Sequence, residues 1–285
     1  MSSNISWSYS KLGKEAFNAS RPFLFKRYPQ VIFINTGDVF QGKFLHSKIS
    51  DSTKLPGQAK KALQAEDILL SEIRPSNGRY AYVDFNAENY VVSTKFMIIE
   101  SYGRVKPRFL FYLLTNKSTL KEFQQIAESR SGTFPQITFD SIKHLPVSVP
   151  PLQVQDDFIK FFDTLNDRIT LFHKTNLTLE AIAQALFKSW FVDFDPVRAK
   201  QEGKQPEGMD ESTAALFPDS FEKSELGEIP KGWKIGKVKD LGEVICGKTP
   251  PTSNANNYSD EVPFITIPDM HGVLTVTTTA RSLSK

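Results

Sequence analysis

The order of apolar and polar residues divides the chain into a β-rich first part and a helical second part. Up to about residue 150, short runs of β-branched and aromatic residues alternate with Gly, Asn and Pro, which is typical of short strands joined by turns. The clearest strand patterns lie at 31–35, 67–74, 80–85 and 90–100. Helical patterns follow at 106–116 and 118–129, the second with Ser118 as its expected N-cap. Because strands and helices do not alternate regularly, residues 1–150 are predicted to form a globular mixed domain of the α+β class.

A pattern with an average period of 3.5 residues follows, from Leu152 to about Asp193, and contains neither glycine nor proline. This period is typical of a coiled-coil helix, so residues 151–193 are predicted to form a long spacer helix. Its predicted interface, which we call the seam, consists of Phe158, Phe162, Leu165, Ile169, Phe172, Asn176, Leu179, Ala183, Leu186 and Trp190. Asn176 is the one polar member, and such a residue commonly fixes register and partner choice. A helix of about 50 Å is too long to lie on one small domain, which favours a coiled coil over a helix packed on its own domain.

The last residues resemble the beginning of the chain. WKIGKVKDLG starts at Trp233 much as WSYSKLG starts at Trp7. Further on, VPFITIPDM (262–270) aligns without gaps to VIFINTGDV (31–39), with Val, Phe, Ile and Asp at identical spacing. Two matching blocks in the same order indicate a duplication. Residues 231–285 are therefore predicted to be the beginning of a second, incomplete copy of the first domain.

Charge is distributed unevenly along the chain. The net charge of +3 combines +8 in residues 1–150, −7 in 151–228 and +2 in 229–285. The acidic middle part includes residues 194–230, whose Pro and Gly content predicts an extended connector with one short helical turn. A basic first domain fits nucleic-acid binding as well as an ordinary solvated surface.

Composition excludes several classes of protein. Cys246 is the only cysteine, so one chain can build neither a disulfide framework nor a cysteine-based metal site, and the four histidines show no ligand spacing. No apolar run approaches the ~20 residues that span a bilayer, and the N-terminus has no secretory pattern. We expect a cytoplasmic protein with no membrane association and no metal site.

One stretch, GEVICGKT at 242–249, matches the phosphate-loop pattern G-x-x-x-x-G-K-[ST] letter for letter. A working phosphate loop follows a buried strand and opens a helix. Here the preceding residues KIGKVKD are polar, and PPTSN follows, where two prolines prevent a regular helix from starting at the lysine. We interpret the match as accidental; an ATP- or GTP-binding enzyme is the rival reading.

The sequence contains no defensible catalytic motif. There is no Ser/His/Asp or Cys/His arrangement, no glycine-rich cofactor fingerprint after a strand, and no Asn/Asp-Pro-Pro-aromatic motif of the kind that handles a flipped base. The chain is predicted to be non-catalytic alone and to bind no cofactor itself.

Several longer stretches carry a resemblance to a known family. They are PKGWKIGKVKDLGEVICGKTP, VPFITIPDM, EDILLSEIRPSNGRYAYV, SGTFPQITFDSIKHLPVSVPPLQVQDDFI and LEAIAQALFKSWFVDFDPV. Together they cover most of the chain, and the PPL-x-x-Q start and LFKSWFVDFDP end of the helical segment are its most specific parts. The chain resembles the DNA-specificity subunit of Type I restriction–modification systems. It departs from the family where LGKEAFNASRPF replaces a GKTP-like stretch after the first tryptophan.

The resemblance implies a division of labour among subunits. In the family, two target-recognition domains each read one half of a split DNA sequence, and two long helices forming an antiparallel coiled coil hold them apart. Methyltransferase subunits bind S-adenosylmethionine and methylate adenine N6, and motor–nuclease restriction subunits use ATP and magnesium for DNA cleavage. This sequence holds one full recognition domain and one helix, so it looks truncated within its second domain. An antiparallel homodimer through residues 158–190 would supply the missing helix.

DNA contacts are expected from basic and polar residues in loops of the first domain. The candidates are Lys43, Lys48, Lys54, Lys60, Lys61, Arg74, Ser76, Asn77, Arg79, Lys95, Arg130, Ser131, Thr133 and Gln136. The alternative reading is a coiled-coil scaffold whose α+β domain binds protein and does not recognise DNA.

Overall fold

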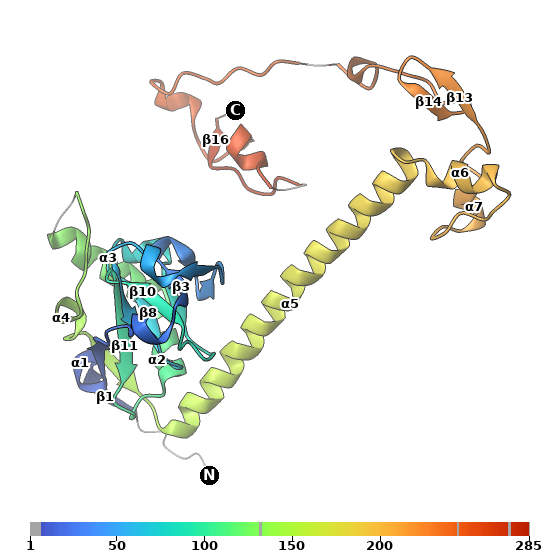
Figure 1. Cartoon of the computed structure of the whole chain (residues 1–285). Helices are drawn as coiled ribbons and strands as arrows, with labels where there is room; N and C mark the ends of the chain where they lie inside the picture. Colours follow the sequence, from blue (N-terminus) through green and yellow to red (C-terminus); the bar gives the residue numbers. More distant parts are fainter. Residues whose placement is uncertain (1–6, 131–132, 244, 273–274, 285) are drawn as a thin grey trace, which may run out of the picture. The chain divides into compact units, whose positions relative to one another are not determined.

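The computed structural model describes residues 7–130, 133–243, 245–272 and 275–284 (Figure 1). The chain forms two compact units, residues 1–179 and 180–285, and each is described by itself. None of the helices in the described ranges combines the length and apolarity of a bilayer-spanning segment.

The first unit is built on two four-stranded sheets. One has the strand order β6-β3-β10-β7 and the other β2-β11-β8-β9; all neighbouring strands are antiparallel except β3 and β10. Their bounds are β2 (Ala16–Ala19), β3 (Gln30–Ile34), β6 (Ile49–Asp51), β7 (Ala59–Ala62), β8 (Ile68–Ser71), β9 (Tyr80–Tyr82), β10 (Tyr90–Ser93) and β11 (Phe96–Ser101). The strand patterns of the sequence therefore all correspond to strands.

Shorter elements surround the two sheets. Two small antiparallel pairs are β1 (Ser8–Lys11) with β12 (Pro146–Val149) and β4 (Val39–Phe40) with β5 (Lys43–Phe44). The helices are α1 (Leu12–Glu15), α2 (Pro107–Thr115), α3 (Lys117–Arg130) and α4 (Phe139–Ile142), and the 3₁₀ turns are η1 (Phe25–Arg27), η2 (Thr36–Asp38), η3 (Ser52–Lys54) and η4 (Pro75–Asn77).

The run at 90–100 forms two strands rather than one. The chain turns at Thr94 and Lys95, where the Thr94 N–H donates to the Gln58 carbonyl (2.9 Å) and the Lys95 N–H to the Ser93 hydroxyl (3.2 Å). β10 then belongs to one sheet and β11 to the other. The run carries no glycine or proline at this crossing, and only the polar residues Ser93, Thr94 and Lys95 interrupt its apolar residues there.

The second sheet is buried on both faces. One face packs against α2 through Ile68, Leu70, Met97, Ile99, Phe109, Leu110 and Leu114. The other packs against the first sheet through Leu69, Phe96, Ile98, Ile32, Ile34 and Val92. A central strand covered on both sides needs apolar residues at every position, which explains why β8 reads ILLS instead of alternating with polar residues.

The two predicted helices are present, but one cap differs. α2 and α3 confirm the helical patterns at 106–116 and 118–129. The expected N-cap Ser118 was wrong: the side-chain oxygen of Asn116 accepts the Thr119 N–H at 3.0 Å, and the Ser118 hydroxyl itself donates to that same oxygen. Asn116 also ends α2, so a single amide serves the junction of both helices.

The spacer helix is α5 (Leu152–Phe191), one helix of 40 residues, as its period predicted. The segment after it is more folded than expected. Residues 194–230 contain α6 (Asp195–Gln201), α7 (Glu211–Ala214) and a hairpin of β13 (Phe221–Ser224) and β14 (Gly227–Pro230). Ring contacts link Phe194, Phe217, Phe221 and Trp233 with the end of α5. The prediction of an extended connector was wrong, because aromatic residues scattered among Pro and Gly pack together in a small cluster.

Both halves of the predicted repeat have the same local structure. β3 leads into η2, where Asp38 Oδ2 accepts the Asn35 N–H at 2.8 Å; β15 (Val262–Phe264) leads into η7 (Ile267–Met270), where Asp269 Oδ2 accepts the Thr266 N–H at 2.8 Å. The remaining elements of this part are η5 (Val238–Asp240), η6 (Ala255–Asn257) and β16 (Arg281–Leu283), which pairs with β15. An α+β domain is thus followed by a long helix and a second, partial β-rich region.

Replacing Gly78 tests the backbone of η4. Gly78 has a φ of 69°, and an added Cβ would lie 3.2 Å from Cγ of Gln41. We expect Gly78→Ala to lower the free energy of unfolding by about 1–2 kcal/mol, because an L residue is strained in the left-handed region. Gly57→Ala is the matched control, since nothing lies within 4 Å of its added Cβ. Chemical denaturation measures both; equal stability of the two variants would contradict the strained turn.

Candidate nucleic-acid interface

A tight turn after β8 presents three of the predicted DNA-contacting residues to solvent. Arg74, which precedes η4, has a φ of 44°, and Gly78 closes the turn. A non-glycine residue in the left-handed region is uncommon, and such residues cluster at functional sites. Arg74, Ser76 and Asn77 are all exposed. The turn thus displays a guanidinium, a hydroxyl and an amide, the groups that read base edges in DNA.

Two neighbouring segments hold this turn. The Arg74 N–H donates to the carbonyl of Pro135 at 3.1 Å. The Ser76 N–H donates to Oε1 of Gln124 on α3 at 3.3 Å. The backbone of the turn is therefore anchored to residues far away in the sequence, while its polar side chains face outward.

The end of α3 and the segment after it contain further candidates for DNA contact, some of them exposed and one of them half-buried. Arg130 and Thr133 are exposed and lie close in sequence to Pro135, which anchors the turn. Gln136 is half-buried, and its Nε2 donates to Oε2 of Glu72 at 2.7 Å, so its amide serves the fold. The predicted contact Ser131 lies outside the described residues.

The β4–β5 hairpin lies beside the same turn. The Gln41 N–H donates to the Gly78 carbonyl at 2.8 Å, and Lys43 on β5 is exposed. Arg79 is half-buried, and its Nη1 donates to the Val39 carbonyl at 3.1 Å. Arg79 therefore ties the hairpin to β9, whereas Lys43 presents a free ammonium group near the turn.

Four other predicted lysines do not lie together at the η4 turn. Lys48 and Lys54 flank β6, and Lys60 and Lys61 belong to β7. β6 and β7 are the two opposite edges of the first sheet, so the four lysines do not form one patch.

Two of the predicted lysines are partly withdrawn from solvent. Lys61 Nζ donates to the Phe96 carbonyl at 2.6 Å, and burial lowers the pKa of this ammonium group. Lys95 is half-buried in the turn between β10 and β11, where its carbonyl accepts the Glu72 N–H at 2.9 Å. Lys61 serves the fold, because a half-buried ammonium that already donates to a carbonyl is a poor phosphate ligand.

The seam of α5 is packed at its two ends and bare in the middle. Phe158 and Phe162 pack on α2, with ring centroids 5.7 Å and 5.2 Å from those of Phe109 and Tyr112. At the other end Trp190 packs on Phe217 and Phe191. The apolar seam residues between these ends are exposed: Leu165, Ile169, Phe172, Leu179, Ala183 and Leu186. Within the first unit, the stripe from Leu165 to Leu179 is therefore not folded back onto the domain.

Sequence reasoning missed the group of residues that fastens α5 to the first domain. Gln155 is completely buried in the first turns of the helix, and Arg108 Nε pairs with Asp163 at 2.9 Å two turns later. The PPL-x-x-Q pattern already contained Gln155, but a polar residue at the start of a helix is normally solvated. Only its contacts reveal a buried position.

The phosphate-loop match lacks both the preceding strand and the following helix that such a loop requires. This holds for the described residues around it, which do not include Val244. No strand leads into Gly242, and no helix begins at Lys248, which is exposed in an irregular segment. The chain therefore lacks, in this described segment, the helix N-terminus that would face a phosphate group.

Comparison with known proteins agrees with this architecture. Residues 10–181 and 230–284 match the family model of the Type I restriction modification DNA specificity domain. The Type I restriction enzyme HindI specificity subunit of Haemophilus influenzae is 48% identical over 317 residues, covering 98% of this chain and 69% of the relative. The MjaIX specificity subunit of Methanocaldococcus jannaschii is 26% identical over 163 residues, covering 57% of this chain and 33% of the relative.

A solved structure has the same fold. The crystal structure of the HsdS subunit from Thermoanaerobacter tengcongensis superimposes with a TM-score of 0.51 at 20% sequence identity, over 90% of this chain and 60% of that one. The chain therefore spans about three fifths of the length of this solved subunit. With the family model matched over both parts of the sequence, the chain belongs to the DNA-specificity subunits of Type I restriction–modification systems, the non-catalytic components of these enzymes.

Proposed function

We propose that residues 1–150 form a target-recognition domain that reads one half of a split duplex DNA sequence, and that α5 holds two such domains at a fixed separation. The base-reading surface is centred on the η4 turn. It comprises Arg74, Ser76, Asn77, Arg130 and Thr133, with Lys43 as a neighbouring phosphate contact. Lys48, Lys54, Lys60 and Lys95 contribute to the general attraction for the phosphate backbone.

The bare middle of α5 carries the proposal. Between Leu165 and Leu186 the large apolar seam residues are 40–65% exposed. Each Å² of apolar surface left in water costs roughly 25 cal/mol relative to its buried state, and contiguous exposed apolar patches mark interaction surfaces. A spacer helix that pairs with a second helix accounts for this stripe.

A second copy of the chain supplies the second helix. An antiparallel register centred on Lys174 puts Phe158 of one copy opposite Trp190 of the other. Beside Phe158 lies an apolar pocket of about 630 Å³, also lined by Trp7, Phe162 and Tyr112. The seam of the partner would therefore continue into a hollow that is already apolar.

This arrangement specifies the geometry of the DNA target. A seam of ~33 residues is about 50 Å long, which corresponds to roughly one and a half turns of duplex at ~34–36 Å per turn. Two identical domains related by the two-fold axis of the dimer read identical half-sites on opposite strands. The expected target is a split palindrome.

The chemistry belongs to partner subunits. Type I methyltransferase subunits, which carry S-adenosylmethionine, and restriction subunits, which carry ATP and magnesium, are the proposed partners of the chain. Co-expression with a Type I methyltransferase subunit, purification of the complex and mapping of methylated adenines test the proposal. A split recognition sequence with regularly spaced halves supports it; a complex that methylates without sequence preference, or binds duplex DNA without a steep salt dependence, overturns it.

Arg74 is the most direct test of the reading surface. In the complex with the methyltransferase subunit, Arg74→Ala should weaken binding by about 1–3 kcal/mol for each half-site and relax specificity at one base pair of each half. Lys43→Ala should weaken binding to all sequences alike and flatten the dependence of log K on log salt by about one unit for each half-site. Fluorescence anisotropy at several salt concentrations distinguishes the two effects.

Arg168→Ala is the control for these variants, since Arg168 is an exposed arginine on α5, outside the reading surface. It should leave affinity and specificity unchanged. If Arg74→Ala behaves like this control, the η4 turn does not read DNA.

Leu179→Asp tests the homodimer. Burial of a leucine contributes ~1.5–3 kcal/mol, and the dimer contains the substitution twice, so its dissociation constant should rise by about 100-fold or more. Leu171→Asp is the matched control, because Leu171 is similarly exposed on the same helix but lies off the seam. Sedimentation equilibrium measures both. A wild-type chain that stays monomeric at micromolar concentration would exclude the dimer.

A further inference from the structure

The long helix leaves the recognition domain without a flexible linker. β12 ends at Val149 and α5 begins at Leu152, so only Pro150 and Pro151 separate strand from helix. Each proline ring fixes its own φ, which removes much of the freedom of this connection. β12 itself is paired with β1, so the base of the helix starts from a fixed strand.

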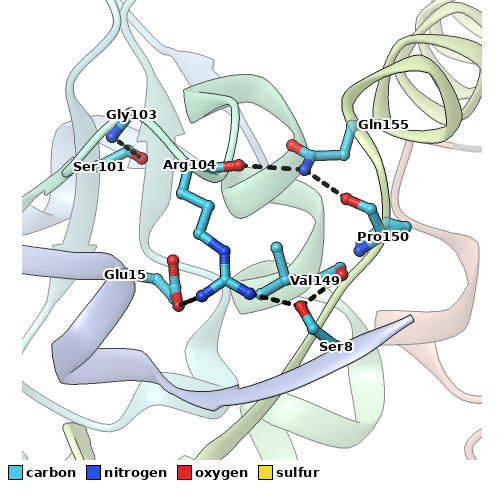
Figure 2. Close-up of polar contacts among 8 residues, drawn as sticks. All are labelled: Ser8, Glu15, Ser101, Gly103, Arg104, Val149, Pro150 and Gln155. Carbon is cyan, nitrogen blue, oxygen red and sulfur yellow. Dashed lines mark hydrogen bonds and ion pairs between the residues drawn. The ribbon is translucent and has the colours of Figure 1, made fainter. Parts of the chain in front are cut away.

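Gln155 then fastens the helix to the domain through its side-chain amide. Its Nε2 donates to the carbonyls of Pro150 (2.9 Å) and Arg104 (3.2 Å), and its Oε1 accepts the Lys106 N–H (2.7 Å). Figure 2 shows the two donated bonds reaching from α5 to the loop before α2 and to the end of the strand. Both amide hydrogens are used, and the side chain is fully buried. One residue thus joins α5, the start of α2 and the strand exit.

Arg104 extends this connection to the N-terminal strand. Its guanidinium pairs with Glu15 at 2.9 Å and also donates to the Ser8 hydroxyl. The Ser8 hydroxyl in turn donates to the Val149 carbonyl at 3.1 Å (Figure 2). The loop held by Gln155 is therefore itself fixed to both strands at the base of the helix.

Further contacts follow along the next turns of α5. Asp163 accepts from Arg108 Nε at 2.9 Å and from the Tyr112 hydroxyl, and Lys106 pairs with Asp156. The ion pairs are partly exposed, and such pairs contribute little. A buried amide is different, because removing it takes away the partner of two carbonyls and an N–H beside a side chain that is itself fully buried. Gln155 is thus a fully buried polar contact at the base of α5.

We infer that Gln155 is a positioning residue that fixes the direction of α5 relative to the recognition domain, and thereby the distance and rotational phase between the two half-sites that the protein reads. The inference rests on the proposed role of α5 as a spacer. A helix amplifies small errors at its base: a tilt of about 5° displaces the far end of a ~50 Å helix by about 4 Å, which is more than the 3.4 Å rise of one base pair. A loose joint would let one complex accept targets with several spacings.

The experiment compares binding to one half-site with binding to two. The complex with the methyltransferase subunit is titrated with duplexes that carry one mapped half-site, or two half-sites whose separation is varied by up to two base pairs either way. Gln155→Met keeps the size of the side chain and removes all three hydrogen bonds. Binding to one half-site should stay within about 2-fold of wild type, while the preference for the natural separation should fall by about 10-fold.

Gln153→Met is the matched control, since Gln153 is exposed on the same turn and its Nε2 donates to Oδ1 of Asp157 on the same helix, at 3.3 Å. It should keep the full preference for the natural separation. Gln155→Glu serves as a second variant in case Gln155→Met does not fold, because its carboxylate can still accept the Lys106 N–H but opposes the two carbonyls. It should broaden the accepted spacings at neutral pH and recover part of the preference when the carboxyl is protonated.

The outcomes separate the inference from the function on which it rests. If the variants of Gln155 keep the wild-type preference for spacing, or lose affinity equally for one half-site and for two, Gln155 is only a structural residue and the inference is wrong. If the wild-type complex shows no preference for spacing at all, the spacer function itself fails.

Discussion

The apolar stripe in the middle of α5 is the constraint on which the arrangement of this protein depends. An isolated helix is marginally stable in water, and most helices in proteins are stabilised by packing of an apolar face. Contacts with α2 at the first turns and with Phe217 at the last ones cover only the ends of α5. The intervening turns leave Ile169, Phe172 and Leu179 more than half exposed. Such a stripe fits the proposed pairing of α5 with a second helix, in which the length of α5 would set the separation of the attached domains.

The first domain separates rigidity from recognition. Its second sheet is covered on both faces, so its strands are held by packing as well as by their pairing with one another. The residues proposed to meet DNA lie on turns, on a hairpin, on the edge strand β7 or at the end of α3, where exchange of an exposed side chain does not disturb the core. The η4 turn is nevertheless well anchored, because Pro135 and Gln124 bind its backbone. Loops held by a stiff scaffold are a common solution for sites whose specificity varies while the fold persists.

The joint between the first domain and α5 combines the buried amide of Gln155 with aromatic packing of Phe158 and Phe162 on α2. Apolar packing is largely non-directional, whereas the amide of Gln155 bonds to three backbone groups with defined directions. The proposed role of α5, holding two reading surfaces in phase with the DNA helix, needs a defined angle and not only a stable contact. The aromatic pairs of Phe158 and Phe162 with α2 add stability on one side of this angle.

Several features followed from the sequence by itself. The strands at 31–35 and 80–85, the helices α2 and α3, the full course of α5 and the repeat of Asp38 in Asp269 were all predicted from local periods and spacing. The strands and helices depend on residues within one or two turns of each other, and the repeat on two blocks with matching residues at equal spacing, so the pattern of the chain was sufficient. The sequence predicted only in part which of the candidate DNA-contacting residues lie together, because a list of basic residues does not state which of them share a surface.

Tertiary structure decided the rest. It assigned β10 and β11 to different sheets, turned Lys61 inward to the Phe96 carbonyl, and folded the segment after α5 around Phe217. It also buried Gln155 against Arg104, a residue 51 positions earlier. Each of these outcomes depends on segments that meet only when distant parts of the chain fold together, and no local period of apolar residues encodes which partners they find.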